Sequence, residues 1–67
     1  MCEANVYMAG QGEGEKLIME DVLYVKVNGA EISLSAIMGE SKTILGRVKE
    51  IDMENHKVII EKEDKGG

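Results

Sequence analysis

The chain has 67 residues, thirteen acidic and eight basic, and its net charge is −5 at pH 7. This charge opposes binding to nucleic acid or to an anionic membrane surface, because both contacts depend on Lys and Arg. The length excludes a second domain, and the single cysteine excludes an internal disulfide. Because signal-peptide features and a membrane-spanning apolar run are also lacking, we expect a cytoplasmic protein that binds neither nucleic acid nor membrane.

The N-terminal segment predicts the first strand. From Cys2 to Met8, apolar and polar residues alternate, as they do in a half-buried β-strand. Residues 9–16 contain three glycines and predict a loop, but no helix pattern or P-loop lysine follows that would make it a phosphate site. An apolar pattern resumes over residues 17–27, and its better-defined strand starts at Asp21.

The dipeptide Asn28-Gly29 predicts a tight β-hairpin with a two-residue turn. The register that follows from this turn pairs Val27 with Ala30, Lys26 with Glu31, Val25 with Ile32, and Leu23 with Leu34. It also places a set of apolar side chains on one face of the hairpin: Leu23, Val25, Val27, Ile32 and Leu34.

The C-terminal half predicts two further strands. A turn around residues 38–41 precedes a strand over residues 43–51, in which Gly46 indicates a bulge or a close approach of another backbone. Residues 52–55 are typical of a type I turn whose asparagine can adopt the left-handed conformation. Residues 58–60 are apolar and form the last predicted strand.

Five short strands without a helical pattern predict an all-β fold, a small five-stranded SH3-like barrel that forms a single domain over residues 1–62. An OB-like barrel is the alternative, disfavoured because the sequence lacks a helix and surface aromatic residues. Residues 63–67 are charged and glycine-containing and predict a disordered C-terminal tail. With no Phe or Trp in the chain, we expect methionines to fill the core, with Met53 exposed in its turn and these three packed: Met8, Met19 and Met38.

Cys2 is the only cysteine, and its position beside the N-terminal amine favours a metal site. If Met1 is retained, the thiolate can chelate a metal with the Met1 amine and the Cys2 amide nitrogen. If Met1 is removed, the Cys2 amine takes this role and the Glu3 amide can extend the ligand set. Such closely spaced nitrogen and sulfur donors suit Ni(II) or Cu(II) better than tetrahedral zinc. Two chains related by a two-fold axis would complete the coordination, which couples metal binding to homodimer formation.

The residues alone leave a second interpretation of Cys2 open. A lone cysteine on the apolar face of a strand is also commonly a small buried hydrophobic residue. The protein would then be a metal-free protein-interaction module. Catalysis is not indicated under either interpretation, because His56, the only histidine, lies in a predicted turn and the carboxylates are scattered over exposed faces.

The sequence resembles the CooT family of small nickel-binding proteins. The resemblance rests on the overall length and on three segments, which are Met1-Cys2-Glu3-Ala4-Asn5-Val6-Tyr7, Asp21-Val22-Leu23 and Ile44-Leu45-Gly46-Arg47-Val48. It implies an SH3-like homodimer that binds Ni(II) through Cys2, with Met1 and Glu3 as neighbours whose backbone atoms could complete the coordination. It also implies a metallochaperone-like accessory role with the machinery that matures nickel carbon monoxide dehydrogenase. Some relatives are labelled predicted RNA-binding proteins, a role that the negative charge of this chain opposes.

Overall fold

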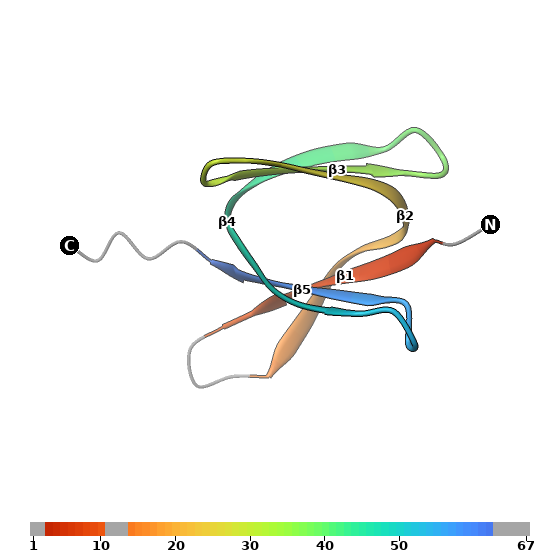
Figure 1. Cartoon of the computed structure of the whole chain (residues 1–67). Coiled ribbons are helices and arrows are strands. Elements are labelled where there is room, and N and C mark those ends of the chain that lie inside the picture. The colour runs from red at the N-terminus through yellow and green to blue at the C-terminus, as the bar shows by residue number, and fades with distance from the viewer. Residues whose placement is uncertain (1–2, 11–13, 63–67) are drawn as a thin grey trace.

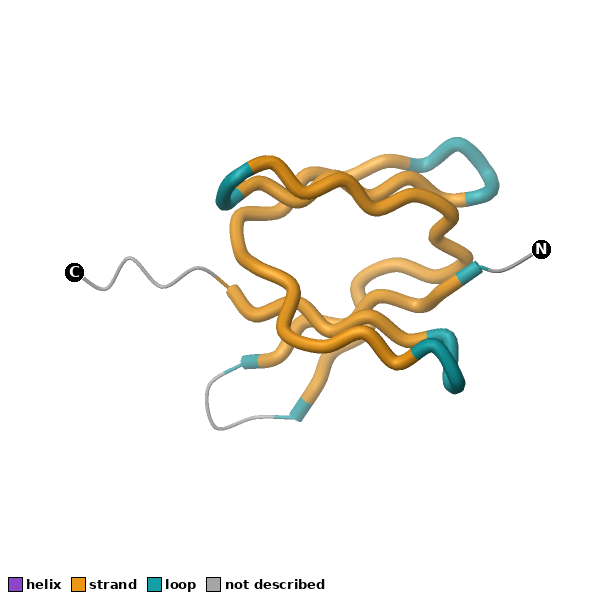
Figure 2. Tube along the Cα trace, in the orientation of Figure 1, coloured by secondary structure: helices purple, strands orange, loops and turns teal. Residues whose placement is uncertain are grey.

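The computed structural model describes residues 3–10 and 14–62, which form a closed barrel of five β-strands (Figures 1 and 2). The strands are β1 (Ala4–Ala9), β2 (Glu15–Asn28), β3 (Glu31–Ala36), β4 (Ser41–Asp52) and β5 (Lys57–Lys62). The all-β prediction is confirmed, and the barrel is consistent with an SH3-like arrangement. Within the described residues, no helix is long and apolar enough to cross a membrane. The predicted tail, residues 63–67, lies outside the described part of the chain.

Each strand pairs with the next one in the sequence in antiparallel orientation, and β1 pairs with β5 in parallel orientation to close the barrel. The parallel pair follows from the odd number of strands, since the first and fifth strands of an up-and-down order run in the same direction. The two long strands, β2 and β4, each take part in both layers of the barrel. Their bends connect the layer that contains β3 to the layer that contains β1 and β5 (Figure 1).

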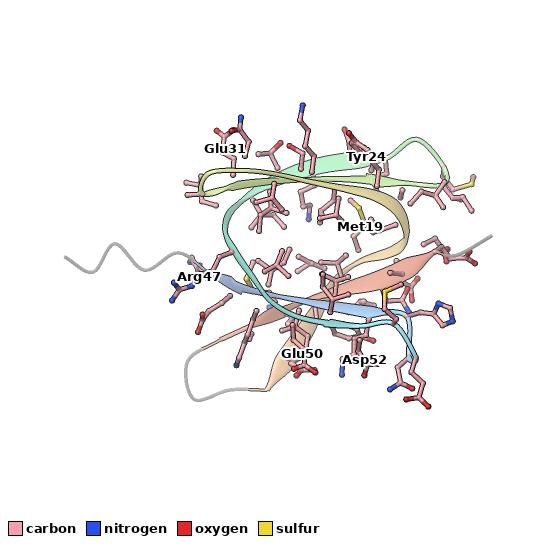
Figure 3. All side chains as sticks on the ribbon, viewed as in Figure 1. Met19, Tyr24, Glu31, Arg47, Glu50 and Asp52 are labelled. Atoms are coloured by element: carbon pink, nitrogen blue, oxygen red, sulfur yellow. The ribbon has the colours of Figure 1, made fainter. Side chains whose placement is uncertain are left out.

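The core is small and aliphatic. It consists of the buried side chains Val6, Met19, Val22, Ile32, Leu34, Val58 and Ile60. Figure 3 shows Met19 inside the barrel and Tyr24 on its outer side. Ile59 is also buried, but it alternates with Val58 and Ile60 along β5 and lies outside this core cluster. Its pairing partner on β1 is the half-buried Tyr7.

The register of β2 is irregular at three points, two against β1 and one against β3. Its inward-facing residues Met19, Val22 and Val25 are spaced by three, because one shift lies between Met19 and Val22 and another between Val22 and Tyr24. Asp21, which lies between Met19 and Val22, has a positive φ of 56°. Each extra residue exchanges the faces of the residues that follow it. Leu23 is consequently 46% exposed, so the prediction that it shares the apolar face of the hairpin is wrong.

The β2–β3 hairpin turns one residue later than predicted. Asn28 pairs with Glu31, and Gly29 occupies the first central position of the turn with φ 62°. The predicted pairs are therefore wrong, although the change of one residue in each strand preserves the alternation and keeps Ile32 in the core. Val27 lies next to the pair that flanks the turn and is 55% exposed. A long-range contact favours the observed turn, because the Gly46 amide donates a 2.8 Å hydrogen bond to the Ala30 carbonyl oxygen.

The prediction for Gly46 is confirmed, since a Cβ at this position would lie 2.5 Å from the carbonyl oxygen of Glu61. The β4–β5 turn is also confirmed, with one correction. The Asp52 carboxylate accepts hydrogen bonds from the Asn55 backbone amide at 3.2 Å and from Asn55 Nδ2 at 2.9 Å. The left-handed residue, however, is His56 with φ 53°, not Asn55.

The methionines are only partly where we predicted them. Met19 is buried and Met8 packs against the core, as expected. Met53 is 77% exposed in its turn, which is also as expected. Met38, predicted to pack, is 87% exposed, because the β3–β4 turn carries it away from the barrel.

Candidate metal centre

The predicted ligand residues lie at the start of the chain. Met1 and Cys2 are outside the described residues, so their role stays a prediction. Glu3 is described, is half-buried and immediately precedes β1. Within the described part of the chain, no three side chains of His, Cys, Asp or Glu form a group that could hold a metal ion.

Asn5 anchors the start of β1 from two sides. Its backbone amide donates a 2.9 Å hydrogen bond to the carbonyl oxygen of His56, next to β5. Its side-chain oxygen accepts a 3.3 Å hydrogen bond from the backbone amide of Asp21 in β2. The parallel register of β1 with β5 begins at the same residue, where Asn5 is paired with Lys57. The backbone is therefore held at a point three residues after Cys2.

Two turns lie at the same end of the molecule as the start of β1, which we call the N-terminal end of the barrel (Figure 1). The β3–β4 turn is joined to it by a 2.9 Å hydrogen bond from the Ile37 amide to the Asp21 carbonyl oxygen. The β4–β5 turn is joined to it through His56, whose amide contacts the Met53 carbonyl oxygen at 3.4 Å. Hydrogen bonds thus connect both turns to β1 through Asp21 and His56.

Two apolar side chains are exposed to solvent at this end. Ile51, near the end of β4, is 60% exposed, and Met53, in the β4–β5 turn, is 77% exposed. Exposed apolar groups that are close together are typical of a surface that contacts another polypeptide.

Electrostatic contacts involve the β4–β5 turn and the first residue of β5. Hydrogen bonds from the side chain and backbone of Asn55 lower the pKa of Asp52. A hydrogen bond to Glu15, assisted by its charge, raises the pKa of Lys57, whose Nζ lies 2.9 Å from the Glu15 carboxylate. The same Nζ lies 5.1 Å from the centre of the Tyr7 ring, which is within range of a cation–π contact. Lys57 thereby links β5 with β1 and β2.

The sequence predicts Cys2 as a metal ligand but gives no signal for the residues that hold the start of β1. His56 was correctly predicted to lie in a turn, and it is exposed there. Its contact with Asn5 had no signal in the sequence, since only the parallel closure of the barrel brings β1 beside β5. The polar side chain of Asn5 alternates normally along β1, so its bond to Asp21 had no signal either.

The fold and this anchoring define a small all-β barrel domain whose first strand is held at Asn5 by residues of β2 and of the β4–β5 turn. The chain matches the family model described as CO dehydrogenase accessory protein CooT over residues 1–61, and it belongs to the CooT family. The family prediction is thereby confirmed, and the family description is that of an accessory protein.

Several similar proteins match this chain over almost the whole length of both chains. An uncharacterised protein of Methanothermobacter thermautotrophicus is 38% identical over 64 residues, which cover 96% of this chain and 94% of the relative. An uncharacterised protein of Methanocaldococcus jannaschii is 34% identical over 61 residues, which cover 91% of this chain and 98% of the relative. Among solved structures, the crystal structure of a CooT candidate from Carboxydothermus hydrogenoformans matches with a TM-score of 0.84 and 27% identity, covering 94% of this chain and 100% of that one.

Proposed function

We propose that this protein is a cytoplasmic nickel-binding accessory protein that takes part in nickel delivery for the maturation of CO dehydrogenase and catalyses no reaction itself. Family membership carries the proposal, because the matched region begins at residue 1 and includes Met1-Cys2. Nickel is then the cargo of the protein.

Cys2 supplies the thiolate ligand in this proposal. The backbone nitrogens of Met1, Cys2 and Glu3 are its neighbouring donors. Nitrogen donors in a planar arrangement suit Ni(II). A thiol with an ordinary pKa of about 8.5 and an amine with a pKa of about 8 must both lose protons to bind the metal. The nickel affinity therefore falls as the solution becomes more acidic.

The anchoring of β1 supports this role. Because Asn5 is hydrogen-bonded to His56 and Asp21, the chain is held close to the metal ligands. Three peptide units span at most about 11 Å, so the reach of Cys2 from the Cα of Asn5 is limited to that distance. We therefore propose the site at the N-terminal end of the barrel.

A homodimer completes the proposed site. One chain offers few donors, whereas two chains around a two-fold axis bring two Cys2 thiolates to one metal ion. The axis would pass near the N-terminal end of the barrel, where Ile51 and Met53 are exposed. Burial of these side chains against the second chain would add a favourable hydrophobic contribution.

The test is a Ni(II) titration of the full chain, followed by thiolate-to-nickel charge-transfer absorption and by light scattering. We expect the band to saturate at one nickel ion per two chains. The variant Cys2→Ser should lose the band and stay folded. A matched control, Cys2→Ser combined with Ser41→Cys, keeps one thiol per chain but moves it to an exposed position of β4, and should not restore the band.

Other outcomes contradict parts of the proposal. Saturation at one nickel ion per chain, with the mass unchanged, would retain nickel binding and remove the shared site. A complete absence of the band in the wild type would favour the metal-free protein-interaction module.

A further inference from the structure

The first half of β2 has a neighbour on only one side. In the part of the chain that the structure describes, residues 15–19 pair with β1, and pairing with β3 begins only at Val22. The other side of the β2 backbone is therefore free of strand pairing over residues 15–20. An exposed strand edge can accept an extended segment of another chain as an additional strand.

A shallow groove runs along this free edge, and we call it the β2 groove. One wall consists of residues 17–21 of β2, and the β3–β4 turn contributes the rest of the lining through Ala36, Met38 and Glu40. Its volume is about 390 Å³, within the range of about 300–1,000 Å³ that is usual for ligand sites. The lining includes the apolar side chains of the buried Met19 and the half-buried Ile18, which we call the apolar floor of the groove.

Backbone hydrogen bonds hold the two walls in place. The Ile37 amide donates to the Asp21 carbonyl oxygen at 2.9 Å, which joins the β3–β4 turn to β2. Within the turn, the Ala36 amide donates to the Glu40 carbonyl oxygen at 2.8 Å. The β2 groove is therefore formed before a partner arrives, which lowers the entropic cost of binding.

The charged residues that line the β2 groove are all acidic. They are Glu20, Asp21 and Glu40, and no Lys or Arg is among the lining residues. The chain as a whole also carries a net charge of −5. A negative groove attracts basic groups and selects against acidic partners. Lys and Arg fit an apolar floor with carboxylates beside it, because their side chains combine an aliphatic stem with a charged end.

From the free edge, the preformed groove and its charge, we propose that the β2 groove binds an extended segment of a partner protein in which basic and apolar residues alternate. The segment pairs with the free edge of β2 through its backbone. Its basic side chains lie against Glu20 and Glu40, and its apolar side chains lie on the floor. This surface does not include the predicted nickel ligands, so binding to it goes beyond the proposed nickel site.

The test uses a fluorescently labelled synthetic peptide of alternating Lys and Val, with binding measured by anisotropy on the full-length protein. We expect saturable binding that weakens when NaCl rises from about 0.1 M to about 1 M, because the screening length falls from about 10 Å to about 3 Å. Backbone amide signals in two-dimensional NMR should shift in residues 17–21 and 36–40. A peptide in which Glu replaces Lys should not bind.

Variants of the protein separate a local effect from overall charge. Glu20→Gln with Glu40→Gln should weaken binding by about two- to fivefold for each carboxylate, as expected for solvent-exposed ion pairs. The matched control is Glu31→Gln with Glu54→Gln, which changes the net charge equally at exposed positions outside the groove and should retain wild-type affinity. Nickel stoichiometry should be the same in both double variants, so failure of this proposal is distinguishable from failure of the nickel site.

Three results would overturn the proposal. The first is equal weakening by the two double variants, which would mean attraction by net charge alone. The second is unchanged affinity for a peptide with an N-methyl group on every residue, because such a peptide has no backbone N–H group to donate to a strand edge. The third is a set of peptide-induced NMR shifts that lies outside the β2 groove.

Discussion

Replacement of Gly46 by alanine should destabilise the barrel, because the added methyl group has no free space. Its Cβ would lie 2.5 Å from the Glu61 carbonyl oxygen, 3.3 Å from the Glu61 carbonyl carbon and 3.2 Å from Ile60 Cγ2. Two of these atoms belong to the backbone of β5, and Glu61 is also paired with Ala9 of β1. The strand cannot move away from β4 without weakening the β1–β5 pair that closes the barrel.

The size of this effect follows from two opposing contributions. Overpacking costs about 1–3 kcal/mol, and the smaller conformational freedom of unfolded alanine returns about 0.4–1 kcal/mol. We expect a net loss of about 1–2 kcal/mol. Since a domain of this length has a total stability of about 3–10 kcal/mol, this loss is a substantial fraction of it. The melting temperature should fall by about 4–16 °C.

The assay is urea unfolding followed by circular dichroism, at one fixed protein concentration because self-association would shift the midpoint. Gly14→Ala is the matched control. No atom lies within 4 Å of its Cβ, so its stability should equal that of the wild type or exceed it slightly. A Gly46→Ala variant as stable as this control would refute the close approach of β4 and β5.

The other predictions concern the core, the β4–β5 turn and the response to acid. Leu34→Ala should lower the free energy of unfolding by about 2–5 kcal/mol, because this side chain is fully buried. Leu23→Ala should lower it by less than about 1 kcal/mol, because Leu23 is 46% exposed. Urea unfolding compares the two variants, and equal losses would contradict the bulge in β2. His56→Gly should raise the urea midpoint by removing the steric cost of a left-handed conformation, a gain of up to about 1 kcal/mol, and a lower midpoint would contradict the positive φ. The lowered pKa of Asp52 means that its carboxylate stabilises the folded state above the ordinary pKa of aspartate, and that this stabilisation disappears as the pH falls through the lowered pKa. The stability difference between the wild type and Asp52→Asn should therefore be largest at neutral pH and shrink at acidic pH, and a constant difference would show that the carboxylate charge has no part in the turn.

Cys2 could be proposed as a metal ligand from the sequence because it is the only thiol in the chain and lies beside the N-terminus. The residues that hold the start of β1 could not be found from the sequence. Asp21 and His56 lie far from Asn5 in the sequence. Asp21 contacts Asn5 across the antiparallel β1–β2 pair, and His56 contacts it because the barrel closes through the parallel β1–β5 pair. The β2 groove is a similar case, since the carboxylate of Glu40 joins that of Glu20 only when the β3–β4 turn packs against β2.

Local patterns in the sequence were sufficient to predict five strands, the burial of Ile32 and Leu34, the turn at Asp52 and the close approach at Gly46. The alternation of residues within a strand indicates which face is apolar, and this face is the one that becomes buried. Register and bulges depend instead on hydrogen bonds between distant segments. The Gly46–Ala30 bond accompanies a hairpin turn that comes one residue later than its dipeptide indicated. Only the closed barrel decided this register, the exposure of Leu23 and the groove beside β2, because each depends on how strands pair across the molecule.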